Sequence, residues 1–251
     1  MATAASVAPA GDVSWQSLYR IGGVAALITA ALSVTGIVTF VVWPPPPPDT
    51  TVTDWFALFQ RNWLLGMLSL DLLMLLAYLA NIPLILALAV ALRRTGQSLA
   101  ALALALGLVA IATYFASSRV FEMLALSRQY AAAATDAQRE MLVAAGQSML
   151  TTYLGPFGGP VALAGWSYQG TAFSISFALW CMAGALISIV MLRDAGFGKV
   201  TGGVGIVGFV VTLGLFLPVV GVFLSLVGLV VQLVWYVLSA RGLLRLAHTT
   251  R

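Results

Sequence analysis

Charged residues are scarce in this chain of 251 residues, because Asp, Glu, Lys and Arg together make up 8% of it while 61% of the residues are hydrophobic. Soluble domains carry roughly 25% charged residues. So few charges cannot keep this much apolar side chain in water, and we therefore expect lipid to be the solvent for most of the chain. The net charge is +4, yet the arginines stand singly or in pairs at the ends of apolar runs, without the basic stripe that nucleic-acid binding requires.

Cysteine and histidine each occur once. Cys181 can form no disulfide within the chain and belongs to no CxxC motif. His248 lies near the C-terminus, outside every apolar run, so no membrane segment offers an imidazole for haem, chlorophyll or a metal ion. A P-loop, an HExxH motif and a Ser–His pair are missing too. We therefore expect no cofactor and no enzymatic activity.

Six apolar segments are long enough to cross a bilayer, for which a helix needs about 20 mostly apolar residues. They cover about residues 21–43, 63–92, 98–118, 171–192, 201–217 and 219–240. The sequence thus predicts an all-α fold, a polytopic membrane protein whose six transmembrane helices lie within residues 19–247. Residues 1–18 are expected to form a disordered cytoplasmic tail, and residues 248–251 a second, short cytoplasmic tail.

Basic residues predict the orientation of these helices. One side of the predicted bundle carries a net charge of +6, and the other a net charge of −1. The first side holds Arg20, Arg93, Arg94, Arg193, Lys199, Arg241, Arg245 and Arg251, with Asp12 and Asp194. The excess of Lys and Arg marks that side as cytoplasmic, so both termini are expected inside. The two turns on this side, at residues 92–96 and 192–196, each end in a glycine that we expect in the left-handed conformation.

Two outer connections are long enough to form short extracytoplasmic helices. In residues 44–62, a polyproline rod at Pro44–Pro48 precedes a segment from Thr53, a predicted N-cap, in which Trp55, Phe56 and Phe59 share one face. This segment is predicted to lie on the membrane surface as an interfacial helix. Residues 119–170 are predicted to form a helical cap. Thr135-Asp-Ala-Gln138 has the form of a capping box, so a helix is expected to begin there and to end before Gly155.

One acidic residue lies within an apolar run, at Asp71. It is about 12 Å along its helix from Trp63, inside the hydrocarbon. A charged carboxylate at such depth costs at least about 2.5 kcal/mol, so Asp71 needs a partner or a proton. Tyr78 lies on nearly the same helix face, Asn81 is offset by roughly a quarter turn, and Arg119 is the best placed cation.

These four residues, Asp71, Tyr78, Asn81 and Arg119, support two readings. In one they bind a small solute or a proton, as in a transporter or channel. In the other, Asp71 sits in an internal salt bridge or is protonated and fixes the helix register. Arg61 is an alternative partner, because a guanidinium can extend down its helix to reach a buried carboxylate. Gln232 and Tyr236, one turn apart, form a further polar pair able to hydrogen-bond across helices.

Several short stretches resemble one family of proteins. They are residues 121–126, 129–133, 170–173, 190–193, 197–201 and 235–241. These stretches are similar to a family of small bacterial multi-pass membrane proteins known as a domain of unknown function. The likeness begins at about Asp54 and does not include Pro44–Pro48. It implies a protein of the bacterial inner membrane and implies no activity or site residue.

Taken with the missing catalytic groups, the sequence predicts a non-catalytic accessory or scaffold subunit of a membrane assembly. Its expected partners are the lipid bilayer and other membrane-protein subunits or further copies of itself, and no nucleic acid. The alternative is a small-solute or proton-coupled transporter or channel that uses Asp71.

Overall fold

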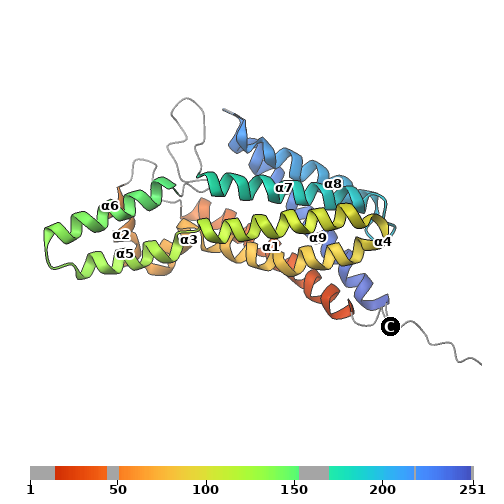
Figure 1. Ribbon diagram of the computed structural model, residues 1–251, viewed down its shortest axis with the longest axis horizontal. Helices are drawn as coiled ribbons and strands as arrows, with labels where there is room; N and C mark the ends of the chain where they lie inside the picture. The colour runs from red at the N-terminus through yellow and green to blue at the C-terminus, as the bar shows by residue number, and fades with distance from the viewer. Residues whose placement is uncertain (1–14, 44–50, 153–169, 218, 250–251) are drawn as a thin grey trace, which may run out of the picture.

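The computed structural model describes residues 15–43, 51–152, 170–217 and 219–249, and throughout these ranges the elements are helices, with no strand (Figure 1). The first six are α1 (Gln16–Val42), α2 (Val52–Arg61), α3 (Trp63–Leu70), α4 (Leu72–Ser117), α5 (Val120–Ala132) and α6 (Asp136–Thr152). They are followed by α7 (Thr171–Met191), α8 (Gly198–Thr212), the 3-10 helix η2 (Leu213–Phe216) and α9 (Gly221–Thr249). The all-α prediction is confirmed.

Five helical stretches of the described chain are long and apolar enough to cross a membrane. They cover Gln16–Thr39, Leu72–Ala132, Thr171–Met191, Gly198–Phe216 and Phe223–His248. Their outward faces carry exposed valine, leucine, isoleucine and phenylalanine side chains, which water would solvate poorly. These features are those of a membrane protein.

Helix α4 doubles back on itself at Gly96, whose φ of −162° and ψ of 68° are not helical. A methyl group on Gly107 would lie 3.2 Å from the Ile85 side chain, although a straight helix would separate these residues by about 33 Å. The two halves of α4 therefore lie side by side, as Figure 1 shows. The predicted turn is present, but its glycine is extended and not left-handed; the only glycine with positive φ in the described chain is Gly198, at 78°. Pro83 keeps helical dihedral angles.

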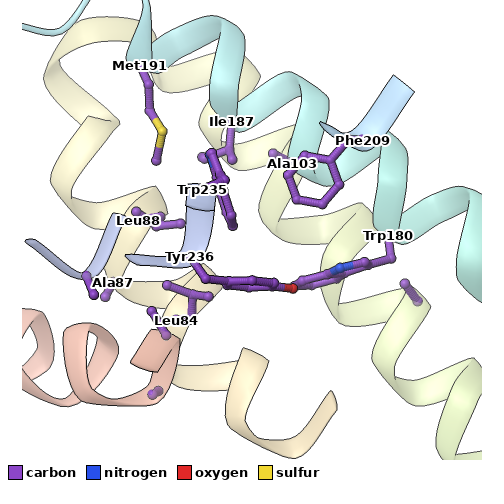
Figure 2. Packing of buried hydrophobic residues seen from close by; sticks show 14 of the residues in the cluster. Leu84, Ala87, Leu88, Ala103, Trp180, Ile187, Met191, Phe209, Trp235 and Tyr236 are labelled. Carbon is purple, nitrogen blue, oxygen red and sulfur yellow. The ribbon is translucent and has the colours of Figure 1, made fainter. Parts of the chain in front are cut away.

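The core of the bundle lies between α1, α4, α7, α8 and α9. Its centre holds large side chains with close ring contacts, such as Phe209 and Trp235, whose ring centroids are 5.0 Å apart at 80° (Figure 2). Close helix approaches need glycine here. A methyl group on Gly205 of α8 would meet Ser188 Oγ at 2.1 Å and Trp235 Nε1 at 2.5 Å. Gly202, Gly205 and Gly208 therefore serve helix packing.

Helices α2, α5 and α6 form a smaller unit at one end of the bundle, with its own apolar core (Figure 1). This α2–α5–α6 unit corrects the prediction of an interfacial helix. Trp55, Phe56 and Phe59 are buried against neighbouring helices, and Phe56 is fully inaccessible. The predicted N-cap is also wrong, because Thr51, two residues before Thr53, caps α2 in a capping box with Asp54. The apolar face of α2 therefore packs in a protein core and not on the membrane surface.

The start of α6 agrees with the sequence. Gln138 N donates to Thr135 Oγ1 at 3.3 Å and Thr135 N donates to Gln138 Oε1 at 3.4 Å, so the predicted capping box is confirmed. Helix α5 is separate from α4, because Ser118 breaks the helix with a ψ of 139°. The predicted polyproline rod at Pro44–Pro48 lies outside the described residues.

The chain ends correct the predicted tails. Helix α1 already begins at Gln16, whose side-chain amide donates to the Ala247 carbonyl at 2.5 Å, so residues 16–18 are helical. Helix α9 continues to Thr249 and includes His248. Trp15 stacks under the Arg93 guanidinium at 5.3 Å, and Asp194 accepts from the Thr95 hydroxyl at 2.5 Å. Both described chain ends and the two turns thus gather at one end of the bundle, which we name the Gly96 end; residues 1–14 and 250–251 lie outside the described part.

Candidate functional site

Asp71 occupies the junction between the bundle and the α2–α5–α6 unit. It ends α3 and begins α4, with a φ of −172° and a ψ of 0° that interrupt the helix. The backbone hydrogen bonds continue across it, from Asp71 N to the Met67 carbonyl and from Leu75 N to the Asp71 carbonyl, each at 3.0 Å. Met67 belongs to the apolar core of the α2–α5–α6 unit, whereas Leu75 packs on the core of the bundle. Asp71 therefore directly precedes the candidate membrane segment that begins at Leu72.

The carboxylate of Asp71 is 6% exposed and accepts a hydrogen bond from the Tyr114 hydroxyl. Tyr114 lies in the second half of α4, is fully buried, and stacks on Tyr78 with 4.0 Å between ring centroids and 6° between the planes. The Tyr114 carbonyl in turn accepts from Ser117 Oγ at 2.8 Å. A polar and aromatic cluster of Asp71, Tyr114 and Tyr78 thus fastens the two halves of α4 together.

Sequence reasoning missed Tyr114. The signal that points to it is the hairpin: when α4 folds back at Gly96, the C-terminal end of its second half returns to the level of Asp71. A polar aromatic residue near residue 118 is then a natural partner for the carboxylate.

The predicted contact between Asp71 and Arg119 is not formed. Arg119 pairs with Glu122 at 3.5 Å and also donates to the Ala116 carbonyl at 3.5 Å. The reason is local, since Glu122 is three residues further along the same helical turn and the Arg119 side chain remains 33% exposed. The alternative partner, Arg61, is exposed on α2.

Asn81 belongs to a second polar cluster, deeper in the bundle. Its Oδ1 accepts from the Thr29 hydroxyl of α1 at 3.2 Å. The Tyr236 hydroxyl of α9 interacts with the side chains of both Asn81 and Trp180, and Figure 2 shows it directed at the Trp180 ring. The four predicted site residues therefore do not form one site. Tyr78 lies in the cluster of Asp71, Asn81 contacts α1 and α9, and Arg119 pairs with Glu122 of α5.

Other buried polar side chains also bind neighbouring helices. Gln232 Nε2 of α9 donates to Thr212 Oγ1 of α8 at 2.7 Å, and Ser176 Oγ of α7 donates to the Ala110 carbonyl of α4 at 2.7 Å. The prediction that Gln232 and Tyr236 bond across helices is confirmed. Within the described chain, the buried atoms without a hydrogen-bond partner include Ser118 Oγ, Trp235 Nε1 and Ser239 Oγ.

Outside the membrane segments of the described chain, the group with a shifted pKa is the Asp54 carboxyl. The Thr51 hydroxyl and then the Thr51 backbone N–H donate to its carboxylate and lower the pKa of Asp54 below its usual range. Among the described residues, no three His, Cys, Asp or Glu side chains gather closely enough to hold a metal ion.

Comparisons with known proteins do not assign the chain to a family. The chain matches no protein-family model, no curated protein and no solved structure. The family resemblance in the sequence stays a prediction.

Proposed function

We propose that this chain is a non-catalytic accessory or scaffold subunit of a bacterial inner-membrane assembly. The observation that supports it is that buried polar side chains form hydrogen bonds between the helices of this chain. Thr29, Asn81, Ser176 and Gln232 all bond to another helix of the same chain. Such contacts stabilise a bundle and leave these groups engaged with protein. The family resemblance supports the bacterial membrane as the location.

The proposed topology has six membrane crossings. The α4 hairpin supplies two of them, and α1, α7, α8 with η2, and α9 supply one each. The Gly96 end is proposed to be cytoplasmic, because the cations of the described bundle gather there. They are Arg20, Arg93, Arg94, Arg193, Lys199, Arg241 and Arg245, against Asp194 as the one described acid.

The α2–α5–α6 unit is then extracytoplasmic and is the proposed partner-binding part. Its core is built from the chain's own helices, yet Phe121 on α5 and Met141 on α6 remain 58% and 68% exposed. Exposed apolar side chains on a unit outside the bilayer favour contact with another protein. Self-association and binding of a different subunit both satisfy this role.

Site-specific photo-crosslinking in native membranes tests the proposal. A photoreactive residue replaces Phe121 or Met141, and Val207, which is 54% exposed on α8, serves as the matched control facing lipid. We expect the same crosslinked product, either a dimer of the chain or one partner subunit, from both positions of the α2–α5–α6 unit and none from position 207. Uncrosslinked monomer at all three positions, with a single monomer mass in mild detergent, would contradict the proposal.

A second candidate function, proton-coupled or small-solute transport, is favoured by one observation. Asp71 lies where the backbone interrupts a helix, and transporters often place binding groups at such interruptions. In this reading Asp71 exchanges a proton while Tyr114 and Tyr78 line the path. Proton flux into liposomes that carry wild type or Asp71→Asn tests this function.

A further inference from the structure

Exposed apolar stripes on three helices all end in a cation at the Gly96 end. On α1, Ile21, Val24, Leu27 and Ile28 follow Arg20. On α8, Val200, Val207 and Val210 follow Lys199, and on α9, Val230, Val234 and Val237 precede Arg241. We name Arg20, Lys199 and Arg241 the basic collar. All three side chains are exposed, and none forms an ion pair with another described residue.

The opposite ends of the same stripes carry no charge within the described residues. The α1 stripe ends at Val41, Val42 and Trp43, and the stripe of α8 and η2 ends at Phe216 and Leu217. The lipid-facing perimeter formed by α1, α8 and α9 is therefore cationic at one rim and neutral at the other. Such a difference matches a membrane whose two surfaces differ in what they offer the protein.

Helix packing places the collar residues at the level of the last turns of α9. A methyl group on Gly23 of α1 would lie 2.8 Å from the Leu244 side chain, so α1 passes α9 beside Arg241. A methyl group on Gly242 would lie 2.6 Å from the Phe197 ring, so the turn before α8 covers α9 at the same level. Arg20, Lys199 and Arg241 each lie within three residues of one of these contacts. The three cations therefore lie at the same end of the bundle.

The one described acid at the Gly96 end, Asp194, forms no ion pair with a collar cation. Asp194 is in the turn between α7 and α8, and both of its carboxylate oxygens already accept hydrogen bonds. Oδ2 accepts from the Thr95 hydroxyl at 2.5 Å and Oδ1 from the Gly196 amide at 2.8 Å. No described acid pairs with a collar cation, so each cation is available to an anion from outside the chain, and the attraction is stronger at the low-dielectric boundary of the membrane.

We propose that the basic collar binds the phosphate groups of anionic phospholipids in the adjoining leaflet. The apolar stripe next to each cation contacts the acyl chains of the lipid, while the cation contacts its headgroup. An arginine or lysine near an anionic membrane surface contributes about a fivefold gain in binding. A free phosphate ion offers the same charge without acyl chains, and so it cannot use the stripes.

Native mass spectrometry of the purified full chain in detergent tests this binding, with phosphatidylglycerol and phosphatidylcholine added at equal concentration. The wild type is expected to retain phosphatidylglycerol at least fivefold more than phosphatidylcholine. The triple variant Arg20→Gln, Lys199→Gln, Arg241→Gln is expected to lose this preference. The matched control is Arg61→Gln, Arg128→Gln, Arg139→Gln, which removes three exposed cations from the α2–α5–α6 unit. It is expected to behave as wild type.

Two further arms keep the result unambiguous. The double variant Arg20→Lys, Arg241→Lys keeps the charges and should keep the preference, so loss in the Gln variant alone is not a folding defect. Inorganic phosphate at millimolar concentration should leave the retained phosphatidylglycerol unchanged. Equal retention of the two lipids by wild type, preference surviving in the collar variant, or displacement of the lipid by inorganic phosphate would each overturn the proposal.

Discussion

The Tyr114 hydroxyl donates a hydrogen bond to the Asp71 carboxylate, and this bond joins the two halves of a helical hairpin that meet only because α4 turns at Gly96. It lies between the core of the bundle and the core of the α2–α5–α6 unit. The acid therefore has an identifiable structural task, which is to hold the two halves of the α4 hairpin in register at the end away from Gly96.

Removing the donor should destabilise this junction. Tyr114→Phe is expected to lower the free energy of unfolding by about 1–2 kcal/mol, because a buried carboxylate loses a hydrogen-bond donor in a setting of low dielectric constant. Tyr130→Phe is the control, since Tyr130 packs its ring on Phe56 and its hydroxyl forms no hydrogen bond with another described residue. Unfolding by denaturant in detergent measures both variants. A Tyr114→Phe variant as stable as Tyr130→Phe would refute the structural role of the bond.

Glycine packing on α8 gives a matched pair of substitutions. Gly205→Ala should destabilise the bundle by about 1–3 kcal/mol, because its methyl group would overlap Ser188 Oγ and the Trp235 ring. Gly203→Ala, on the same helix, meets nothing within 4 Å and should be neutral or slightly stabilising. Thermal unfolding of the two variants in one detergent compares them. Equal midpoints would show that α8 does not pack on α7 and α9 as described.

The bond between α8 and α9 should be measurable in the same way. Thr212→Val removes the oxygen that accepts from Gln232 Nε2, and is expected to cost about 0.6–1.7 kcal/mol. Thr35→Val is the control, because the exposed Thr35 hydroxyl bonds only to its own helix, at the Ala31 carbonyl. A double-mutant cycle with Gln232→Leu isolates the pair. A coupling energy indistinguishable from zero would remove Gln232 from the list of interhelical contacts.

Lowering the pH should destabilise the N-terminus of α2, where the capping box lies. The pKa of Asp54 is lowered in the folded state by its bonds to Thr51, so the folded chain binds fewer protons than the unfolded chain. The contribution of the capping box is therefore present above about pH 4 and is lost as the pH falls through the lowered value. Hydrogen exchange of the α2 amides, corrected for the intrinsic effect of pH, should show faster opening at the acid end in wild type. Asp54→Asn should remove the pH difference, and equal protection of wild type at both pH values would contradict the expectation.

The features that could be predicted from sequence are those set by local chemistry. The capping box at Thr135 and the turn at Gly96 follow from residues adjacent in the chain, and both are present. The apolar runs likewise predict helices long enough to cross a membrane, because hydrocarbon requires every backbone group to bond within its own helix.

The predictions that were wrong or missing concern contacts that depend on how distant helices pack. The aromatic face of α2 is equally suited to a membrane surface and to a protein core, and the sequence alone cannot separate the two environments. Arg119 paired with Glu122 because a partner three residues away costs less chain ordering than a distant carboxylate. Tyr114 escaped notice because its relation to Asp71 arises only once the hairpin has closed.

Proton flux in liposomes tests most directly whether Asp71 holds the fold or carries a solute. Wild type and Asp71→Asn are reconstituted at equal density, a pH gradient is imposed, and the internal pH is followed with a trapped dye. Asn keeps an oxygen that can accept from Tyr114 but cannot exchange a proton, so the structural account predicts equal rates for both proteins, matching protein-free liposomes. A wild-type flux that disappears in Asp71→Asn, with the variant still folded, would contradict it and establish the transport reading.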